Sequence, residues 1–555
     1  MDSDDSSQKS SEKSRRSLLG LRQLSSDAKG FFKEQVTKAK HVRDDLVHKR
    51  GEPSTPKRDV DPTQAQPLIS SPITPSTPTT PWTSWKALPR QPKTDGKALP
   101  QQPTPSLSSP QPRLHHLSAL RVGLTSLVVL HHTAIPYGGL GNWGWHSPCF
   151  PSMSPALAGF NAVNQTFFMA GFYWLAGYFT HGQLQKLIQR RAAPKSPSSS
   201  RREEGTSISF VTGRAQRLVV PAVAYTVLAA PLFRLLILAS DRSLALSSSD
   251  VKQLLRNYFE TLRGIKGPVW FSVVLFFFDA IAAGVATLRP SSFQQWPTWS
   301  SPQRKYVLGA FGLSALTAFL VRVPFPVGRI LTPLNLQPAF LPQYIFAYAM
   351  GHICANTGSM YLHSLFLSSR NEPLSSLALS VVTMMLGLAA TLASTMLSQK
   401  RIPSFTAGLK LTAGGLNLPA ALYAIWNELG FITLLPSLVA VCEKYFNRAD
   451  LLTFGLPRFS PFRKTPNKER RKVNLARYSY ATFLVHPIVS LGVELLAQRF
   501  IMPHVDCSQL SKGKTAWALC APVVATVVVG SVNTVASWMA GIAMVECVPF
   551  VGRWI

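Results

Sequence analysis

The chain has 555 residues, of which 46% are hydrophobic, and its formal net charge is +31. The apolar residues are unevenly spread, because residues 1–115 hold almost no apolar run and many runs of membrane-spanning length follow. The positive charge therefore does not indicate a nucleic-acid partner, since Lys and Arg gather in the cytoplasmic loops of polytopic membrane proteins. The sequence contains no zinc spacing, P-loop or dinucleotide fingerprint.

Residues 1–115 are rich in Ser, Thr, Pro and Lys, as in the segment ISSPITPSTPTTPW. Such a composition cannot bury enough apolar area to offset its chain entropy, so we predict a disordered cytoplasmic tail. The first residues, MDSDDSSQKS, lack the apolar core of a signal peptide. Targeting is therefore expected to fall to the first membrane helix.

The first apolar stretch, 117–136, contains Arg121 and His132, eleven positions apart. In an α-helix this separation is three turns plus about 20°, so both side chains share a face roughly 16 Å apart along the axis. His131 would point about 80° away from that line. Ionisable groups inside a membrane are costly, so the pair is a candidate functional site. The simpler alternative for His132 is a structural histidine bonded to a backbone carbonyl.

Residues 116–555 predict an all-α bundle of about ten membrane-spanning helices. The stretches are 117–136, 156–180, 217–239, 268–287, 306–321, 338–355, 375–397, 411–446, 478–498 and 515–546. The stretch 411–446 exceeds one span and contains Gly414, Gly415 and Pro419. We expect a re-entrant piece there, followed by a helix at 429–446.

Charge predicts how these spans are oriented. The loop 137–155 has no Lys or Arg, whereas the loops 181–216 and 447–477 are strongly basic. The positive-inside rule makes the basic loops and the N-terminus cytoplasmic, and 137–155 lumenal or extracellular. The loop 240–267 does not follow the positive-inside rule, because the order of the predicted spans places it on the lumenal or extracellular side. It carries Arg242, Lys252, Arg256, Arg263 and Lys266.

A second basic pair stands at the predicted cytoplasmic start of the third span. GRAQRLVVP places Arg214 and Arg217 three residues apart, on neighbouring positions of one helix face. Together with Arg121 they give three guanidinium groups at one end of the bundle, and their forked donors match phosphate. The alternative is that each Arg simply follows the topology rule.

Two acids inside predicted spans, Asp279 and Glu428, are candidates to orient the histidine. An ion pair between Asp279 and Arg234 is at least as good an expectation. Cys149 and Cys507 both fall in predicted lumenal loops, where an oxidising compartment permits a disulfide, and two free thiols are the alternative.

Two short motifs and several apolar segments occur in a fixed order. The motifs read Arg121-VGLTSLVVLH-His132 and Arg214-AQ-Arg217, and the segments are LHHTAIPYGG, FFMAGFYWLAGYF, GPVWF, PQYIFAYAMG and YSYATFLVHP. This arrangement resembles the acyltransferase-3 family of integral membrane acyltransferases over about 117–555. The variant LVVLHHTAIPYGG is most similar to the eukaryotic, especially fungal, branch.

The resemblance implies an enzyme that moves an acyl group from acetyl-CoA or another acyl-CoA to a hydroxyl. It would be an acyltransferase of the class that transfers groups other than aminoacyl groups. His132 would be the catalytic base, because burial favours the neutral imidazole. Arg121, Arg214 and Arg217 would bind the phosphates of CoA, and no metal is expected. Trp270, Tyr344 and His486 lie in family-like segments, where pocket roles and ordinary interfacial roles are equally expected.

If the protein is an O-acetyltransferase, its acceptor is expected to be a small metabolite, for example in secondary-metabolite biosynthesis. A sugar or glycan is the other expected acceptor. A small acceptor reached from the membrane plane or the cytosol is favoured, because no lumenal domain is predicted. The protein would be multi-pass in the bilayer of an endomembrane or the plasma membrane. The alternatives are a transporter of small organic molecules, which needs no thioester donor, and a non-catalytic protein with the same fold.

Overall fold

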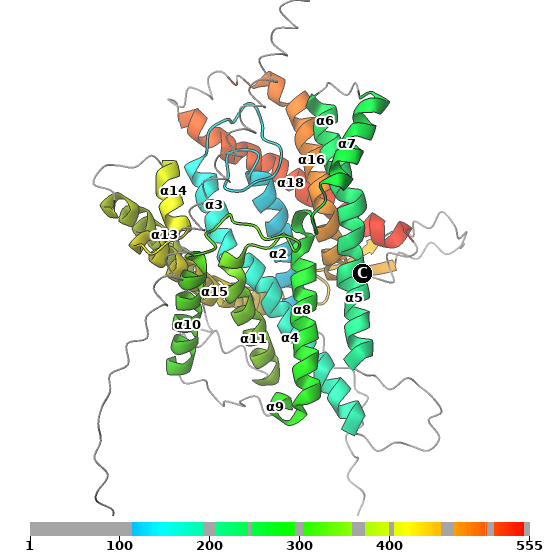
Figure 1. The fold of residues 1–555 in the computed structure, drawn as a ribbon, viewed down its shortest axis with the longest axis vertical. Helices are drawn as coiled ribbons and strands as arrows, with labels where there is room; N and C mark the ends of the chain where they lie inside the picture. The colour runs from blue at the N-terminus through cyan, green and yellow to red at the C-terminus, as the bar shows by residue number, and fades with distance from the viewer. Residues whose placement is uncertain are drawn as a thin grey trace, which may run out of the picture. The chain divides into compact units, whose positions relative to one another are not determined.

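The structure, a computed structural model, describes residues 114–192, 207–241, 246–294, 304–357, 372–398, 405–456, 471–505, 507 and 516–548. The predicted disordered tail lies outside these ranges up to residue 113. Within them the chain is almost entirely helical, which confirms the all-α prediction (Figure 1). In the described part, β1 (Thr453–Leu456) and β2 (Arg471–Asn474) form one antiparallel pair, which the sequence did not predict.

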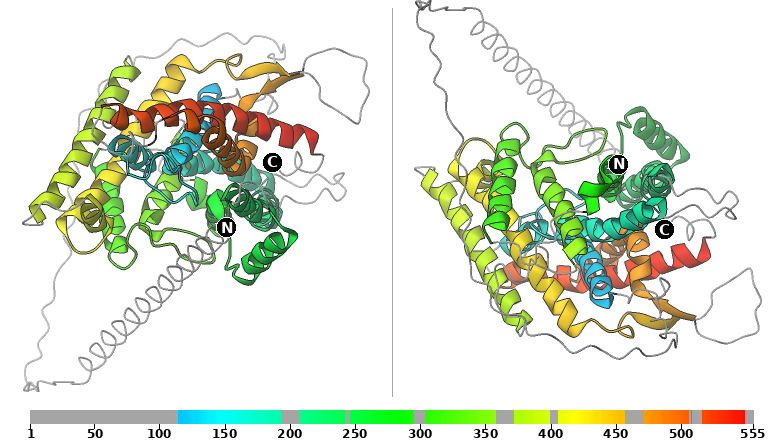
Figure 2. Two further views of the ribbon diagram at one scale, coloured as in Figure 1. Left: turned by 90° about the horizontal axis from the view of Figure 1, so that it is seen from above. Right: turned by 90° about the horizontal axis from the view of Figure 1, so that it is seen from below.

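The central element is α2 (His115–Ala134), which corresponds to the predicted span 117–136. It packs against α4 (Phe168–Ala192), α15 (Leu418–Tyr445), α16 (Ser479–Phe500) and α18 (Ala516–Cys547). Viewed along the long axis, α2 lies among the other helices rather than at the edge of the bundle (Figure 2). A helix surrounded on several sides in this way can carry polar groups that face the protein interior instead of lipid.

The other helices surround this centre. They are α3 (Pro155–Gln165), α5 (Ser207–Ala224), α6 (Ala230–Asp241), α7 (Ser248–Glu260), α8 (Trp270–Leu288), α9 (Pro290–Gln294), α10 (Arg304–Arg322), α11 (Leu341–Thr357), α13 (Pro373–Ser398) and α14 (Phe405–Ala413). A π-helical turn, η1 (Tyr225–Ala229), joins α5 to α6. α4 packs on α11, α5 on α8, and α13 on α15.

Small residues allow α4 and α11 to approach closely. A Cβ atom added at Gly177 of α4 would collide with the backbone carbonyl of Tyr348 on α11. A Cβ atom at Gly351 of α11 would collide with the backbone carbonyl of Trp174 on α4. Glycine at helix crossings lets the two backbones pack directly. Such close packing is a common means of helix association in membranes, because lipid tails are as apolar as the side chains and burial in them gives no hydrophobic driving force between helices.

Two predicted spans are divided differently from expectation. The stretch 156–180 breaks between α3 and α4, and Gln343 donates from Nε2 to the carbonyl of Thr166 at this break, at 2.8 Å. The predicted helix at 429–446 is wrong in its start, because α15 already begins at Leu418. Asn417 caps it by accepting from the amide of Ala420 at 2.8 Å, and proline is tolerated in the first turn of a helix.

Six helical segments among the described residues are long and apolar enough to cross a membrane. They are Ser207–Ser240, Gly267–Leu288, Pro373–Ser398, Leu418–Tyr445, Leu475–His504 and Leu519–Cys547. The protein is therefore a multi-pass membrane protein by length and composition, and the predicted number of ten spans is not confirmed.

Candidate functional site

A pair of histidines from two distant segments forms the centre of the site. His132 lies in the last turn of α2, and His486 lies on α16. The Nδ1 atom of His132 is 2.9 Å from the Nε2 atom of His486, and their rings are stacked with centroids 5.0 Å apart. The His132 side chain therefore has a direct hydrogen-bond partner within the bundle.

A proline in α16 determines how the protons of this pair are arranged. In a regular helix the amide of residue 487 would donate to the carbonyl of Phe483, but Pro487 has no N–H. The Nδ1 atom of His486 lies 2.6 Å from this carbonyl oxygen. Because a carbonyl can only accept, Nδ1 of neutral His486 carries the proton and its Nε2 atom is the acceptor.

The same reasoning fixes the tautomer of His132. Its Nδ1–H donates to His486, so the Nε2 atom of neutral His132 carries the lone pair. Orientation of a basic imidazole through its other nitrogen is the usual arrangement in general-base sites. Here the orienting group is a second histidine and a backbone carbonyl.

Trp143 covers the His132 ring from the loop between α2 and α3. The two rings are stacked, with centroids 4.6 Å apart and an angle of 20° between their planes. The indole Nε1–H donates to the Glu494 carboxylate on α16 at 3.2 Å. The same loop is tied down by a disulfide between Cys149 and Cys507, so the predicted pairing is present in the structure.

His132 lines a cavity of about 960 Å³. Its lining includes His131, His132, Trp143, Trp270 and Tyr344, so both aromatic residues singled out in family-like segments contribute to it. His131, which was expected to point about 80° away from the line of Arg121 and His132, lines the same cavity, and its ring centroid lies 5.5 Å from that of His132. The cavity surrounds the end of α2 over a wide arc, so a rotation of about 80° does not take a side chain out of it.

The three predicted arginines lie outside this lining. The Arg121 guanidinium sits over the Phe179 ring, 5.0 Å from its centroid, and Arg214 donates from Nη2 to the Thr180 hydroxyl at 2.7 Å. Because Phe179 and Thr180 are consecutive on α4, α2 and α5 bring these two arginines to one level of the bundle. Arg217 is exposed on α5, one turn beyond Arg214.

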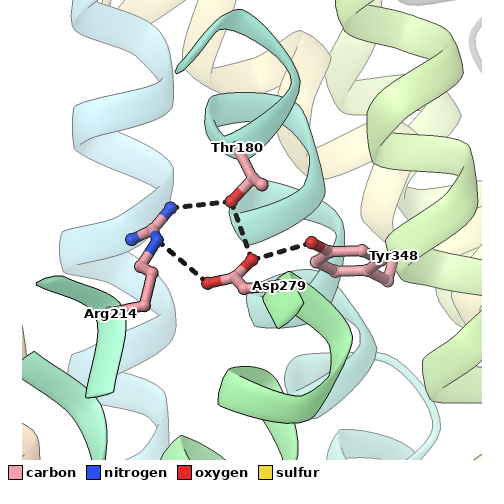
Figure 3. Close-up of polar contacts among 4 residues, drawn as sticks. All are labelled: Thr180, Arg214, Asp279 and Tyr348. Carbon is pink, nitrogen blue, oxygen red and sulfur yellow. Dashed lines mark hydrogen bonds and ion pairs between the residues drawn. The ribbon is translucent and has the colours of Figure 1, made fainter. Parts of the chain in front are cut away.

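Arg214 also pairs with Asp279, which lies on α8 (Figure 3). Its Nε atom is 3.1 Å from one carboxylate oxygen, and the other oxygen accepts from Thr180 at 2.9 Å and from the Tyr348 hydroxyl at 2.7 Å. The expected pairing of Asp279 with Arg234 is therefore wrong. Arg234 instead lies over the Tyr258 ring, with its guanidinium carbon 5.1 Å from the ring centroid.

Neither acid proposed to orient His132 contacts it. Asp279 is engaged by Arg214, and Glu428 accepts from the Ser314 hydroxyl at 2.7 Å. The buried acid nearest to this arrangement is Glu494, which was not predicted and is linked to His132 through Trp143. Its position inside the predicted span 478–498 was the available signal, because acids within apolar spans are rarely without a role.

Comparison with known proteins agrees with this architecture. A family model described as an acyltransferase domain matches residues 114–539, which is most of the chain. The protein therefore belongs to the acyltransferase-3 family and is a membrane acyltransferase. No curated protein and no solved structure matches it. Within the described ranges, no three His, Cys, Asp or Glu side chains gather as a metal site requires.

Proposed function

We propose that the protein is a membrane O-acyltransferase that moves an acyl group, most simply acetyl, from acyl-CoA to a hydroxyl of a small molecule. The observation that carries this proposal is the hydrogen-bonded series from His132 through His486 to the Phe483 carbonyl. It leaves one imidazole nitrogen with a lone pair at the wall of a large cavity. Family membership supplies the reaction class.

In the proposed reaction, the acceptor hydroxyl gives its proton to Nε2 of His132 while its oxygen attacks the thioester carbonyl. This attack forms the new carbon–oxygen bond, and collapse of the tetrahedral intermediate then re-forms the carbonyl and breaks the carbon–sulfur bond. The imidazolium then returns the proton to the leaving thiolate. His486 would help to stabilise the imidazolium, because its Nε2 atom accepts the Nδ1–H bond at 2.9 Å.

The donor would enter from the opposite end of α2. Arg121 lies eleven residues before His132, which corresponds to roughly 16 Å along the helix axis. Arg121, Arg214 and exposed Arg217 would bind the CoA phosphates, which would hold the thioester within reach of the histidine. The pairing of Arg214 with Asp279 orients its guanidinium. The acceptor is a small metabolite, including one of secondary metabolism, or a sugar.

The experiment supplies purified protein in detergent with radiolabelled acetyl-CoA and a panel of alcohols. His132→Ala should reduce acyl transfer by about 10²- to 10⁴-fold, the usual contribution of a general base. Arg121→Ala should raise the KM for acetyl-CoA more than it lowers kcat. His115→Ala is the matched control, because His115 lies on the same helix outside the cavity lining.

Full activity in the His132 variant would remove the mechanism. Flux of a small molecule across proteoliposomes without acyl transfer would instead support the transporter. His131 is unsuitable as a control because it lines the same cavity.

A further inference from the structure

The cavity beside the histidines has a marked excess of positive charge. Among the residues that the structure describes, its lining contains two cationic side chains, Arg234 and Lys266, and no Asp or Glu. Two buried acids, Glu428 and Glu494, lie outside the lining and are held by hydrogen bonds from Ser314 and Trp143. A cavity of this kind attracts anions, because low-dielectric walls focus the field of fixed charges.

Thr226, a residue of the π-helical turn, connects the segments that carry Arg234 and Lys266. The Thr226 carbonyl accepts from the Tyr258 hydroxyl at 2.6 Å, and the Tyr258 ring supports the Arg234 guanidinium. The Thr226 hydroxyl accepts from the backbone amide of Lys266 at 3.2 Å. Single π-turns inside α-helices are frequent at functional sites, and here the turn places two cations on one wall.

The part of the cavity wall around Lys266 is closely packed. Gly267 has φ +70° and follows Lys266 directly, and a Cβ atom there would approach the Tyr225 ring to 2.7 Å. Only glycine fits both the backbone conformation and this contact. Arg234 lies over the Tyr258 ring, with its guanidinium carbon 5.1 Å from the ring centroid, and a guanidinium offers forked N–H donors that match a carboxylate.

The same residues account for an irregularity of the sequence. The loop 240–267 is basic although it is predicted to lie outside the membrane, against the positive-inside rule. Lys266 is one of its cations and lines the cavity. A positive charge at this position has a physical reason if it binds an anionic group of a ligand.

We propose that this cavity binds the acceptor and that the acceptor carries an acidic group, such as a carboxylate, held by Arg234 and Lys266. Its apolar body would lie against the aromatic wall that includes Trp270 and Tyr344, and its hydroxyl would reach Nε2 of His132. This inference rests on the proposed acyl transfer and names its substrate class. It places acceptor entry at the end of α2 opposite to Arg121, rather than in the cytosol.

The test is an equilibrium binding measurement, which does not depend on turnover. Calorimetry on the full chain in detergent compares hydroxynaphthoate with the neutral hydroxynaphthamide, which has nearly the same shape. The wild-type protein should prefer the acid. Arg234→Gln and Lys266→Gln should each reduce that preference by about fivefold, the upper range for solvent-accessible ion pairs, and the double variant should abolish it.

The matched control is Arg256→Gln, which removes a cation from the same basic segment. Arg256 pairs with Glu260 at 2.7 Å and lies outside the cavity lining, so the preference for the acid should be unchanged. Equal binding of acid and amide by wild type, or no binding of the acid up to millimolar concentration, would overturn the proposal. So would a loss of acetyl-CoA binding, in place of acid binding, in the Arg234 variant.

The failure of this proposal can be distinguished from failure of the proposed reaction. His132→Ala should abolish acyl transfer and keep the preference for the acid over the amide. If the wild-type protein prefers the acid but shows no transferase activity, the proposed reaction is refuted and the anion site remains. Transferase activity that is indifferent to acceptor charge would remove the anion site and leave the reaction.

Discussion

The orienting histidine gives the sharpest test of the site. In the His486→Ala variant, the Nδ1–H of His132 loses its acceptor at 2.9 Å, and the ring loses a stacking partner. The imidazole is then free to rotate or to adopt the other tautomer, in which Nε2 carries the proton and cannot act as a base. Transfer should fall while binding of acyl-CoA at the proposed arginine site stays the same.

The size of the effect follows from the type of bond. A neutral hydrogen bond contributes about 0.5–1.5 kcal/mol, and leaving a buried donor unsatisfied costs about 1–3 kcal/mol. The cost of about 1–3 kcal/mol for the unsatisfied donor corresponds to a decrease in kcat of about 5- to 150-fold. The decrease should stay below the roughly 10⁴-fold loss typical of a triad aspartate, because His486 is neutral and lacks a carboxylate charge.

The assay measures initial rates of acyl transfer at saturating donor for wild type, His486→Ala and His486→Gln. Glutamine retains a side-chain oxygen that can accept from His132, so this variant should recover a substantial part of the lost rate. Thermal unfolding in detergent identifies variants that fail to fold. The reasoning is refuted if the alanine variant keeps full kcat, or if both variants lose the same amount while folding normally.

Three further substitutions test the surrounding structure. Asp279→Asn leaves Arg214 without its counter-charge and should destabilise the fold by about 2 kcal/mol, less than a fully buried pair because the Arg214 side chain keeps 18% of its exposure; an unchanged melting temperature would contradict this. Gly351→Ala should destabilise by about 1–3 kcal/mol through collision with the facing helix, whereas Gly182→Ala, with open space around it, should be tolerated in the same unfolding assay. Pro487→Ala restores a backbone N–H that competes with His486 for the Phe483 carbonyl. The melting temperature should therefore rise while the rate of acyl transfer falls several-fold. A transfer rate equal to wild type would exclude the role given to the proline.

Much of the fold could be predicted from the order of apolar stretches. Each of the ten stretches coincides with helical structure, because runs of that length and hydropathy have few other stable states in lipid. Their division was less predictable. The early start of α15 depends on the cap at Asn417, and the break before α4 is stabilised by Gln343 from another helix.

The candidate site was predictable only in part. Spacing alone placed Arg121 and His132 on one face of one helix, and the helix is present as expected. Sequence also marked His486, without indicating its partner. A contact between residues 354 positions apart is decided by how α2 and α16 pack, and helical periodicity carries no information about that packing.

The sequence by itself determined the class of protein, the helical content and the helix that carries His132, because these depend on composition and local periodicity. Tertiary structure decided what each charged group contacts. It paired Asp279 with Arg214 instead of Arg234, and it turned Arg234 towards the cavity. The energy of an ion pair depends on the distance between its charges, which is known only after the helices have packed. The packing therefore decides which cations are paired within the protein and which are available to a substrate.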